Sequence, residues 1–237
     1  MRTGVQLYSL REYIEENGLE KALEIISAAG FEGVEFAGFY QKSADEINTL
    51  LKKYNLKAIS AHVGVDAMDE QLPLLKGLGM NSVVIPWAQL DDEEQFSQFS
   101  EKLPALMEKL SGEGLVLGYH NHAHEFKDGR DRIAELCEKV PSLKLEPDVF
   151  WLAVAGVDAE KFLTENRERL LYLHIKELGK DYTDVNPVVG SGNASIAKAL
   201  ELGKEFGVEW AILEVERIDM PWADYLKKSN EFMKKYR

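Results

Sequence analysis

The residues able to do chemistry gather at the ends of short β-rich segments. All five histidines lie in or just after such segments, and none lies in an expected helix: His62, His120, His122, His124 and His174. Carboxylates and tryptophans share this placement: Glu35, Asp148, Glu214 and Glu216, with Trp87 and Trp151. Imidazole and carboxylate together favour Mn²⁺, Zn²⁺, Fe²⁺ or Co²⁺, whereas sites built only from oxygen suit Mg²⁺ and Ca²⁺. A divalent metal site is therefore the first hypothesis.

Each residue taken singly also has a structural interpretation. A single histidine in a strand is more often a hydrogen-bonded residue of the core or rim than a ligand. Glu35 can pair with an arginine at the end of a barrel, and Trp87 can cap the core. The shared placement favours a common site, because chance would scatter the histidines over helices as well.

The elements that position these residues repeat one pattern: an amphipathic helix, a Gly or Asn stop, and a short β-rich strand. The expected strands are Val5–Tyr8, Gly33–Phe36, Leu56–His62, Ser82–Ile85, Leu115–His120, Leu143–Glu146, Leu171–Ile175 and Trp210–Val215. The expected helices are Leu19–Ala29, Asp45–Tyr54, Met68–Leu78, Glu93–Leu110, Arg130–Lys139, Asp158–Arg169, Ser195–Phe206 and Trp222–Tyr236.

Strict alternation of strands and helices predicts parallel strands joined by helical crossovers. Eight units in 237 residues are close to the roughly 250 residues of a (β/α)₈ TIM barrel. A doubly wound sheet would place a Gly-rich phosphate loop after the first strand, where this chain has Ser9–Arg11. We therefore expect one α/β domain, a TIM barrel over residues 1–237. In such a barrel the active site lies at the carboxyl ends of the strands.

Composition excludes several classes of function. The chain has 28 Lys and Arg against 41 Asp and Glu, a formal net charge of −13, so neither nucleic acid nor an anionic membrane is an expected partner. A single cysteine, Cys137, allows neither an internal disulfide nor a Cys-rich zinc site. No apolar run approaches the roughly 18 residues of a membrane span, and the first residues do not form a signal peptide. The expected compartment is the cytoplasm.

Six stretches carry a family resemblance over nearly the whole chain. They are Gly4–Arg11, Gly30–Glu35, Tyr119–Phe126, Glu146–Trp151, Leu173–Lys176 and Ile212–Glu214. With them the sequence resembles the xylose-isomerase-like sugar phosphate isomerase/epimerase superfamily, a group of divalent-metal TIM barrels. The Tyr-His-Asn-His run that begins at Tyr119 is the most specific of these motifs.

The resemblance implies one metal ion (Mn, Zn, Fe, Co or Mg) held at the ends of strands five to eight. Asp148, His174 and Glu214 match three of the family's ligand positions. The strand-five ligand is usually a Glu, and here the sequence departs from the family pattern. Either His122 replaces that carboxylate, or Glu125 reaches back from the following loop. We favour His122, because strand alternation puts it on the same face as His120.

The resemblance also implies proton abstraction next to a carbonyl, through an enediolate. In the metal-dependent epimerases resembled, two Glu residues flank the substrate; here Glu214 remains, and His120 or Glu125 would be the second acid/base group. Return of the proton gives isomerisation or epimerisation of a sugar, keto sugar or inosose. Loss of a β-substituent gives a lyase or dehydratase acting on a 3-keto sugar or inosose.

Further residues are expected to bind the sugar. Glu35, His62 and Lys176 would bind hydroxyl groups, and Trp87 and Trp151 would offer apolar ring faces. A phosphate group is not expected, because free cationic charge at the strand ends is sparse. The loop Val189–Asn193 is either a simple connection or a set of backbone N–H groups presented to an anion.

Three alternatives remain at this point. A metal-dependent endonuclease needs a basic groove, against which the net charge argues. A non-catalytic sugar-binding barrel would explain the missing strand-five Glu. A metal-free aldolase would use Lys176 as its Schiff-base lysine. The oligomeric state is open, because Met220–Trp222, Phe39 and Tyr40 suit a cover over either the chain's own site or that of another copy.

Overall fold

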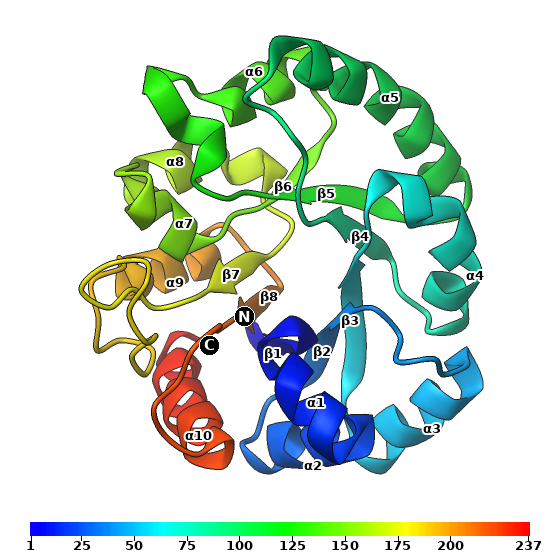
Figure 1. Ribbon diagram of the computed structural model, residues 1–237, viewed down its shortest axis with the longest axis vertical. Coiled ribbons are helices and arrows are strands. Elements are labelled where there is room, and N and C mark those ends of the chain that lie inside the picture. The colour runs from blue at the N-terminus through cyan, green and yellow to red at the C-terminus, as the bar shows by residue number, and fades with distance from the viewer.

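The computed structural model describes residues 1–237, and its strands form a parallel sheet curled into a nearly closed barrel (Figure 1). The strands are β1 Arg2–Gln6, β2 Gly33–Ala37, β3 Lys57–His62, β4 Ser82–Ile85, β5 Val116–His120, β6 Lys144–Glu146, β7 Leu173–Ile175 and β8 Trp210–Leu213. Their order in the sheet is β6-β5-β4-β3-β2-β1-β8-β7. The predicted (β/α)₈ TIM barrel is confirmed.

The barrel closes between β6 and β7 through isolated contacts rather than a regular ladder. One parallel bridge pairs Asp148 with His174. Backbone N–H groups of His174 and Leu171 donate to the carbonyl oxygens of Pro147 and Leu145, at N···O distances of 2.9 and 2.7 Å. Two strands of only three residues each are therefore held at this seam by a few hydrogen bonds.

Helices surround the sheet as the sequence pattern predicts, with two additions. The helices are α1 Arg11–Asn17, α2 Leu19–Ala28, α3 Ala44–Lys53, α4 Met68–Gly77, α5 Glu93–Gly112, α6 Arg132–Lys139, α7 Val149–Val154, α8 Ala159–Glu165, α9 Ile196–Glu205 and α10 Trp222–Met233. The short helices α1 and α7 were not expected. The first strand also begins and ends earlier than predicted, at Arg2 and Gln6, because Leu7–Leu10 forms a 3₁₀ turn that includes Tyr8. No helix is both long and apolar enough to cross a lipid bilayer.

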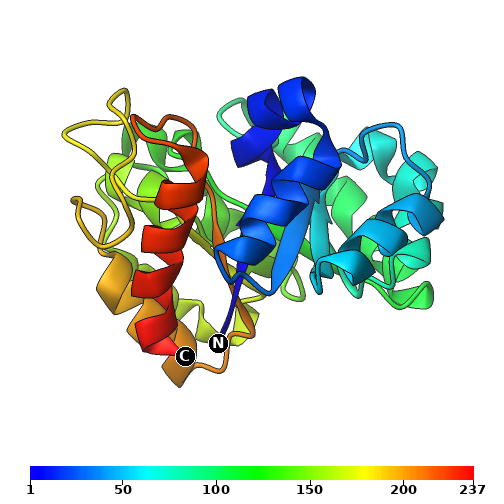
Figure 2. The same ribbon diagram turned by 90° about the horizontal axis from the view of Figure 1, so that it is seen from below.

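An apolar layer fills the barrel interior toward the amino ends of the strands. Ile59, Tyr172, Trp210 and Ile212 form this layer and are all buried. Gly4 on β1 makes room for it: a Cβ atom there would lie 2.3 Å from Cδ1 of Ile59. Because this layer plugs the barrel, polar residues facing inward can gather only toward the carboxyl ends of the strands. The two termini lie at the opposite end of the barrel from α1 (Figure 2).

Candidate functional site

A cleft opens at the carboxyl ends of the strands. It has a volume of about 460 Å³ and is lined by Tyr8, Ala37, His62, Pro86, Trp87, His120, His122, Glu214 and Glu216. Tyr8 and Trp87 are 46% and 50% exposed and present aromatic rings to this space. The cleft therefore combines an apolar wall with imidazole and carboxylate groups.

Four buried side chains at the base of the cleft form the first His/carboxylate group. His120 ends β5, Asp148 follows β6, His174 lies in β7 and Glu214 follows β8. One ligand atom from each lies within 4.8 Å of the others. We call these four residues the outer group. They come from four successive strand ends, so the closing of the barrel is what brings them together.

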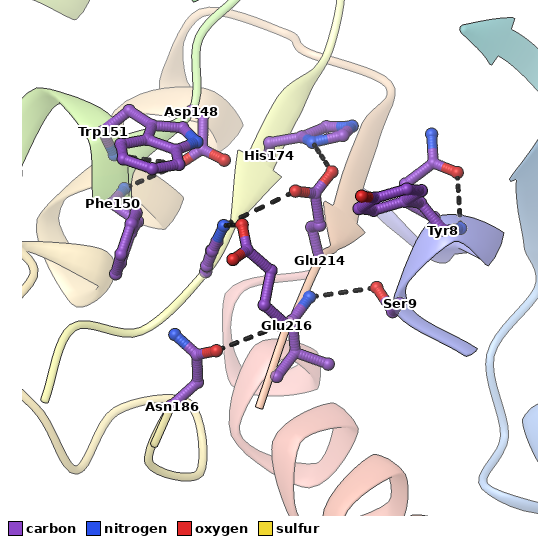
Figure 3. Close-up of polar contacts among 12 residues, drawn as sticks. Tyr8, Ser9, Asp148, Phe150, Trp151, His174, Asn186, Glu214 and Glu216 are labelled. Carbon is purple, nitrogen blue, oxygen red and sulfur yellow. Dashed lines mark hydrogen bonds and ion pairs between the residues drawn. The ribbon is translucent and has the colours of Figure 1, made fainter. Parts of the chain in front are cut away.

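Asp148 is held in place as the N-cap of α7. Its Oδ1 accepts the backbone N–H groups of Phe150 and Trp151 at 2.8 and 3.2 Å, as Figure 3 shows. Its own N–H donates to Oδ1 of Asn121 at 3.1 Å. The second oxygen, Oδ2, is buried without a hydrogen-bond partner. Burial raises the pKa of Asp148 to about 7 although the charge of Lys176 opposes this rise, and a bound cation would further favour the charged form.

Glu214 lies between an imidazole and an ammonium group (Figure 3). Its Oε2 is 3.2 Å from Nδ1 of His174, and its Oε1 is 3.6 Å from Nζ of Lys176. Lys176 also forms an ion pair with Glu216. Burial opposes the charged form of Lys176, but the carboxylates of Glu214 and its neighbours raise its pKa. A lysine held as an ammonium ion is a poor Schiff-base nucleophile, which disfavours the aldolase alternative.

A second group lies immediately inside the first. His62, His120, Glu146 and His174 also bring ligand atoms within 4.8 Å of one another, and we call them the inner group. Oε1 of Glu146 lies 2.9 Å from Nε2 of His62 and 3.0 Å from Nε2 of His174. Glu146 was not among the expected site residues. Its spacing from Asp148 was the available signal, because residues i and i+2 of a strand share a face.

The residues present fit a divalent cation. Four buried carboxylates meet here, from Glu35, Glu146, Asp148 and Glu214, and one buried lysine accompanies them. Buried charges of one sign require pairing or a metal. Polar atoms that are buried without a hydrogen-bond partner also gather here: Nδ1 of His120, His122 and His174, Oε2 of Glu146 and Oδ2 of Asp148. Imidazole with carboxylate is the donor set of Mn²⁺, Zn²⁺, Fe²⁺ and Co²⁺ sites.

The structure places His120, rather than the expected His122, with the other predicted ligands. His122 lines the cleft outside both groups, with its ring centroid 5.0 Å from that of His120 and 5.1 Å from that of Trp151. Burial, with a smaller contribution from His120, lowers the pKa of His122 to about 2. His122 is therefore a neutral imidazole facing the substrate space.

Glu125 lies outside the cleft and outside both groups. The hydroxyl of Tyr119 donates to its Oε1 at 2.8 Å, and the backbone N–H of His122 donates to its Oε2 at 2.9 Å. Nδ1 of His124 is 3.3 Å from the same Oε2. Both oxygens are thus engaged in holding the segment after β5, so Glu125 does not reach the outer group.

The expected sugar-binding residues divide into two sets. His62 and Trp87 line the cleft. Trp151 and Lys176 do not line it, and the Lys176 ammonium lies 4.7 Å from the centroid of the Trp151 ring. Glu35 is fully buried beneath the cleft.

Tyr8 and Glu216 line the cleft but were not predicted to bind a substrate. The 3₁₀ turn after β1 brings Tyr8 to the mouth, with the Arg11 guanidinium 4.3 Å from its ring centroid. No sequence pattern marked this turn. Glu216 is one of the carboxylates expected at a strand end, and it follows Glu214 at the i, i+2 spacing of residues that share a face of a strand.

The Gly-rich loop after β7 binds a carboxylate of the chain itself. Backbone N–H groups of Gly190 and Ala194 each donate to Glu177 at 2.9 Å, and that of Leu178 donates at 3.1 Å. Glu177 is buried. Its carboxylate accepts the N–H of Gly190, within the Val189–Asn193 loop, and that of Ala194, directly after it. The structure therefore favours a tethered connection over an external anion site.

The fold and this site define a TIM barrel with a His/carboxylate centre at the carboxyl ends of its strands. The chain belongs to the xylose isomerase-like TIM barrel family, whose model matches residues 23–236. No curated protein matches the chain.

Solved structures share the fold at low sequence identity. A sugar phosphate isomerase/epimerase from Parabacteroides distasonis is 19% identical, with a TM-score of 0.80 over 98% of this chain and 92% of the other. D-allulose 3-epimerase from Methylomonas sp. is 17% identical, with a TM-score of 0.78 over 100% and 98%. A probable 3-DHS dehydratase from Bacillus anthracis is 14% identical, with a TM-score of 0.79 over 99% of each chain.

Proposed function

We propose that this protein is a metal-dependent sugar isomerase or epimerase. The observation that carries the proposal is the outer group, His120, Asp148, His174 and Glu214, at the base of a cleft of sugar size. Family membership supports an enzyme that modifies sugars, since folds this similar include proteins described as sugar phosphate isomerase/epimerase and D-allulose 3-epimerase.

The outer group would hold one divalent ion, with His120 in the position that His122 was expected to fill. When bound, such an ion acts as a Lewis acid that stabilises negative charge on the carbonyl and hydroxyl oxygens of a substrate. The protein's own contribution is to orient the substrate and to move protons.

Glu214 is the base in this proposal. Burial would raise its pKa, but the adjacent His174 imidazole and the charge of Lys176 hold the pKa of Glu214 well below its usual range. The carboxylate is therefore ionised, and it lines the cleft where the proton next to a substrate carbonyl would lie. Removal of that proton leaves an enediolate.

The second proton-transfer group is an imidazole. With His120 among the ligands and Glu125 outside the cleft, His62 is the lining histidine that can return a proton to the neighbouring carbon or to the opposite face. Its Nε2 is engaged by Glu146, so Nδ1 is its remaining polar atom. Neutral His122 would accept or donate a hydrogen bond to a substrate hydroxyl.

The substrate class is an unphosphorylated sugar, keto sugar or inosose. No lysine or arginine is among the residues that line the cleft, so a phosphate group has no charged partner there. The exposed rings of Tyr8 and Trp87 suit the apolar face of a sugar ring.

A dehydratase acting on a 3-keto sugar or inosose is the second candidate. The observation that favours it is His120 on strand five, where the epimerases resembled have a second glutamate. Glu214 would take the proton next to the carbonyl, and His62 would protonate the departing β-hydroxyl, so that water is lost. The shared fold of a probable 3-DHS dehydratase is consistent with this route.

Proton exchange with solvent tests the proposal. The Mn²⁺- or Co²⁺-loaded protein is incubated in D₂O with a panel of ketohexoses, 3-keto glucosides and inososes. Exchange of the proton next to the carbonyl is followed by mass spectrometry. After removal of the paramagnetic metal, it is also followed by ¹H NMR. We expect exchange with wild type and none with Glu214→Gln. Loss of water from the substrate during exchange would favour the dehydratase over the isomerase or epimerase. Sugar binding without exchange would instead support a non-catalytic sugar-binding barrel.

A further inference from the structure

We propose that Glu35 and Glu146 are positioning residues that fix which nitrogen of His174 faces the metal centre. The inference rests on the proposed function, because it concerns how a ligand of that centre is oriented. Neither carboxylate lines the cleft, so neither is placed to touch the substrate.

The two nitrogens of His174 face different partners. Nε2 lies 2.6 Å from Oε2 of Glu35 and 3.0 Å from Oε1 of Glu146. Nδ1 lies on the side of the outer group, 3.2 Å from Oε2 of Glu214, without the geometry of a hydrogen bond. All four residues are buried, so water does not compete for these contacts.

This arrangement determines the tautomer. A neutral imidazole carries its proton on one nitrogen and a lone pair on the other. Two carboxylate oxygens at Nε2 require the proton there, because two acceptors cannot face a lone pair. Nδ1 faces the Glu214 carboxylate at 3.2 Å, so its lone pair is available to the outer group when a cation takes the place of a proton there. Carboxylate support of this kind is how proteins orient histidine ligands of metals.

The supporting carboxylates are themselves held rigidly. Oε2 of Glu35 accepts a hydrogen bond from Nε2 of Gln6 at 2.8 Å, and Oε1 accepts one from the hydroxyl of Ser60. Nε2 of His62 lies 3.3 Å from Glu35 and 2.9 Å from Glu146, so it links the two carboxylates. The position of the His174 ring is therefore imposed by residues of four strands, β1, β2, β3 and β6.

The inner group supports an ion rather than binding a second one. Both groups need His120 and His174, and a neutral imidazole has only one lone pair to give. In the inner group, Nε2 of His62 and Nε2 of His174 are both already at hydrogen-bond distance from Glu146. Two of the buried atoms without hydrogen-bond partners, Oδ2 of Asp148 and Nδ1 of His174, lie in the outer group, and Oε2 of Glu146 is the one such carboxylate oxygen of the inner group.

Metal affinity and nitrogen NMR of isosteric variants test this inference. Glu35→Gln and Glu146→Gln remove one charge each while keeping the side-chain shape. Glu177→Gln is the matched control, because Glu177 is a buried carboxylate that bonds only backbone N–H groups of its own loop. Zn²⁺ affinity is measured by chelator competition, and the ring nitrogens of the zinc-loaded proteins are assigned with ¹⁵N-labelled histidine.

We expect one ion per wild-type chain, zinc on Nδ1 of His174 and a proton on Nε2. Affinity should fall about 10- to 100-fold in the Glu35 or Glu146 variant and stay within a few-fold in the control. Unchanged affinity in both variants, or zinc on Nε2, overturns the inference while the metal-dependent function stands. Two ions per chain, one lost with Glu146→Gln, would make Glu146 a ligand instead. No ion in wild type removes the function and the inference together.

Discussion

Asp148 and His174, two candidate metal ligands, are joined by an isolated β-bridge at the seam where the barrel closes. The strands on either side of this seam, β6 and β7, have three residues each. An ion held by both residues would thus also hold the seam, which links metal binding to the stability of the barrel.

Removing metal is therefore expected to lower the thermal midpoint. A ligand that binds only the folded chain stabilises it by about 2.7 kcal/mol at a free concentration 100 times its dissociation constant. Differential scanning calorimetry of the wild type, with Mn²⁺ or with EDTA, measures this effect. His174→Ala should show the same midpoint in both conditions. A wild type insensitive to every divalent metal would contradict the coupling.

Two substitutions of Asp148 should separate its two roles. Asp148→Asn retains an oxygen that accepts the N–H groups of Phe150 and Trp151, so α7 keeps its cap. Asp148→Ala loses that cap, at a cost of about 1 kcal/mol. Both variants lose the anionic ligand, so both should bind metal more weakly.

The measurement is urea unfolding in EDTA together with metal titration. We expect only Asp148→Ala to be clearly less stable without metal. Equal stability of the two variants would show that the cap contributes little. Full metal affinity in either variant would remove Asp148 from the ligands.

A pair of alanine variants can show whether His120 or His122 is the metal ligand from strand five. His120→Ala should lose bound metal, because His120 belongs to the outer group. His122→Ala should retain the metal and weaken substrate binding instead, since His122 lines the cleft outside that group. Elemental mass spectrometry of both dialysed proteins gives the answer. Loss of metal from the His122 variant alone would restore the ligand expected from the sequence.

The fold could be predicted because its signals are local and repeated. Each helix stop and each β-rich run can be seen in a window of about ten residues, and eight repeats leave few topologies. The two helices that were missed, α1 and α7, are only seven and six residues long. At that length a periodic apolar face is hard to see, and α8, also seven residues long, could be predicted because it lies within a longer amphipathic stretch, Asp158–Arg169.

The sequence predicts which strand ends carry the site. It does not predict which residue at each strand end reaches the site. Histidines and carboxylates at these positions were visible, and Asp148, His174 and Glu214 do converge. The choice between His120 and His122 depends on which residue of β5 pairs with Glu146, and that register is set by packing across the sheet. Whether a polar side chain reaches the cleft, as His62 does, or lies beneath it, as Glu35 does, likewise depends on tertiary packing.

Glu125→Gln tests whether the segment after β5 is structural. A glutamine can accept the His122 N–H on its oxygen only if its NH₂ faces the Tyr119 hydroxyl, which must then accept instead of donate, so hydrogen bonds to a carboxylate are replaced by weaker neutral ones. We expect a loss of about 1–3 kcal/mol in the free energy of unfolding and metal affinity close to that of wild type. Chemical unfolding and chelator competition measure the two quantities. A large loss of metal affinity with unchanged stability would make Glu125 a ligand.

Asn186 ties the long loop after β7 to the segment that carries Glu216. Its Oδ1 accepts the N–H groups of Glu216 and Arg217 at 3.0 and 3.1 Å, and its Nδ2 donates to the carbonyl of Glu177 at 2.9 Å. Because Asn186 is 4% exposed, Asn186→Ala leaves buried polar groups unpaired. We expect a loss of about 1–3 kcal/mol in the free energy of unfolding.

The same variant should be cleaved faster within residues 178–195, because the loop loses its anchor to the segment after β8. Limited proteolysis with mass spectrometry locates the cuts, and urea unfolding gives the stability. Asn48→Ala is the control, since Asn48 donates one side-chain hydrogen bond, to the carbonyl of Gly77, at the surface. Equal proteolysis of the two variants would show that the loop is held by Glu177 without the help of Asn186.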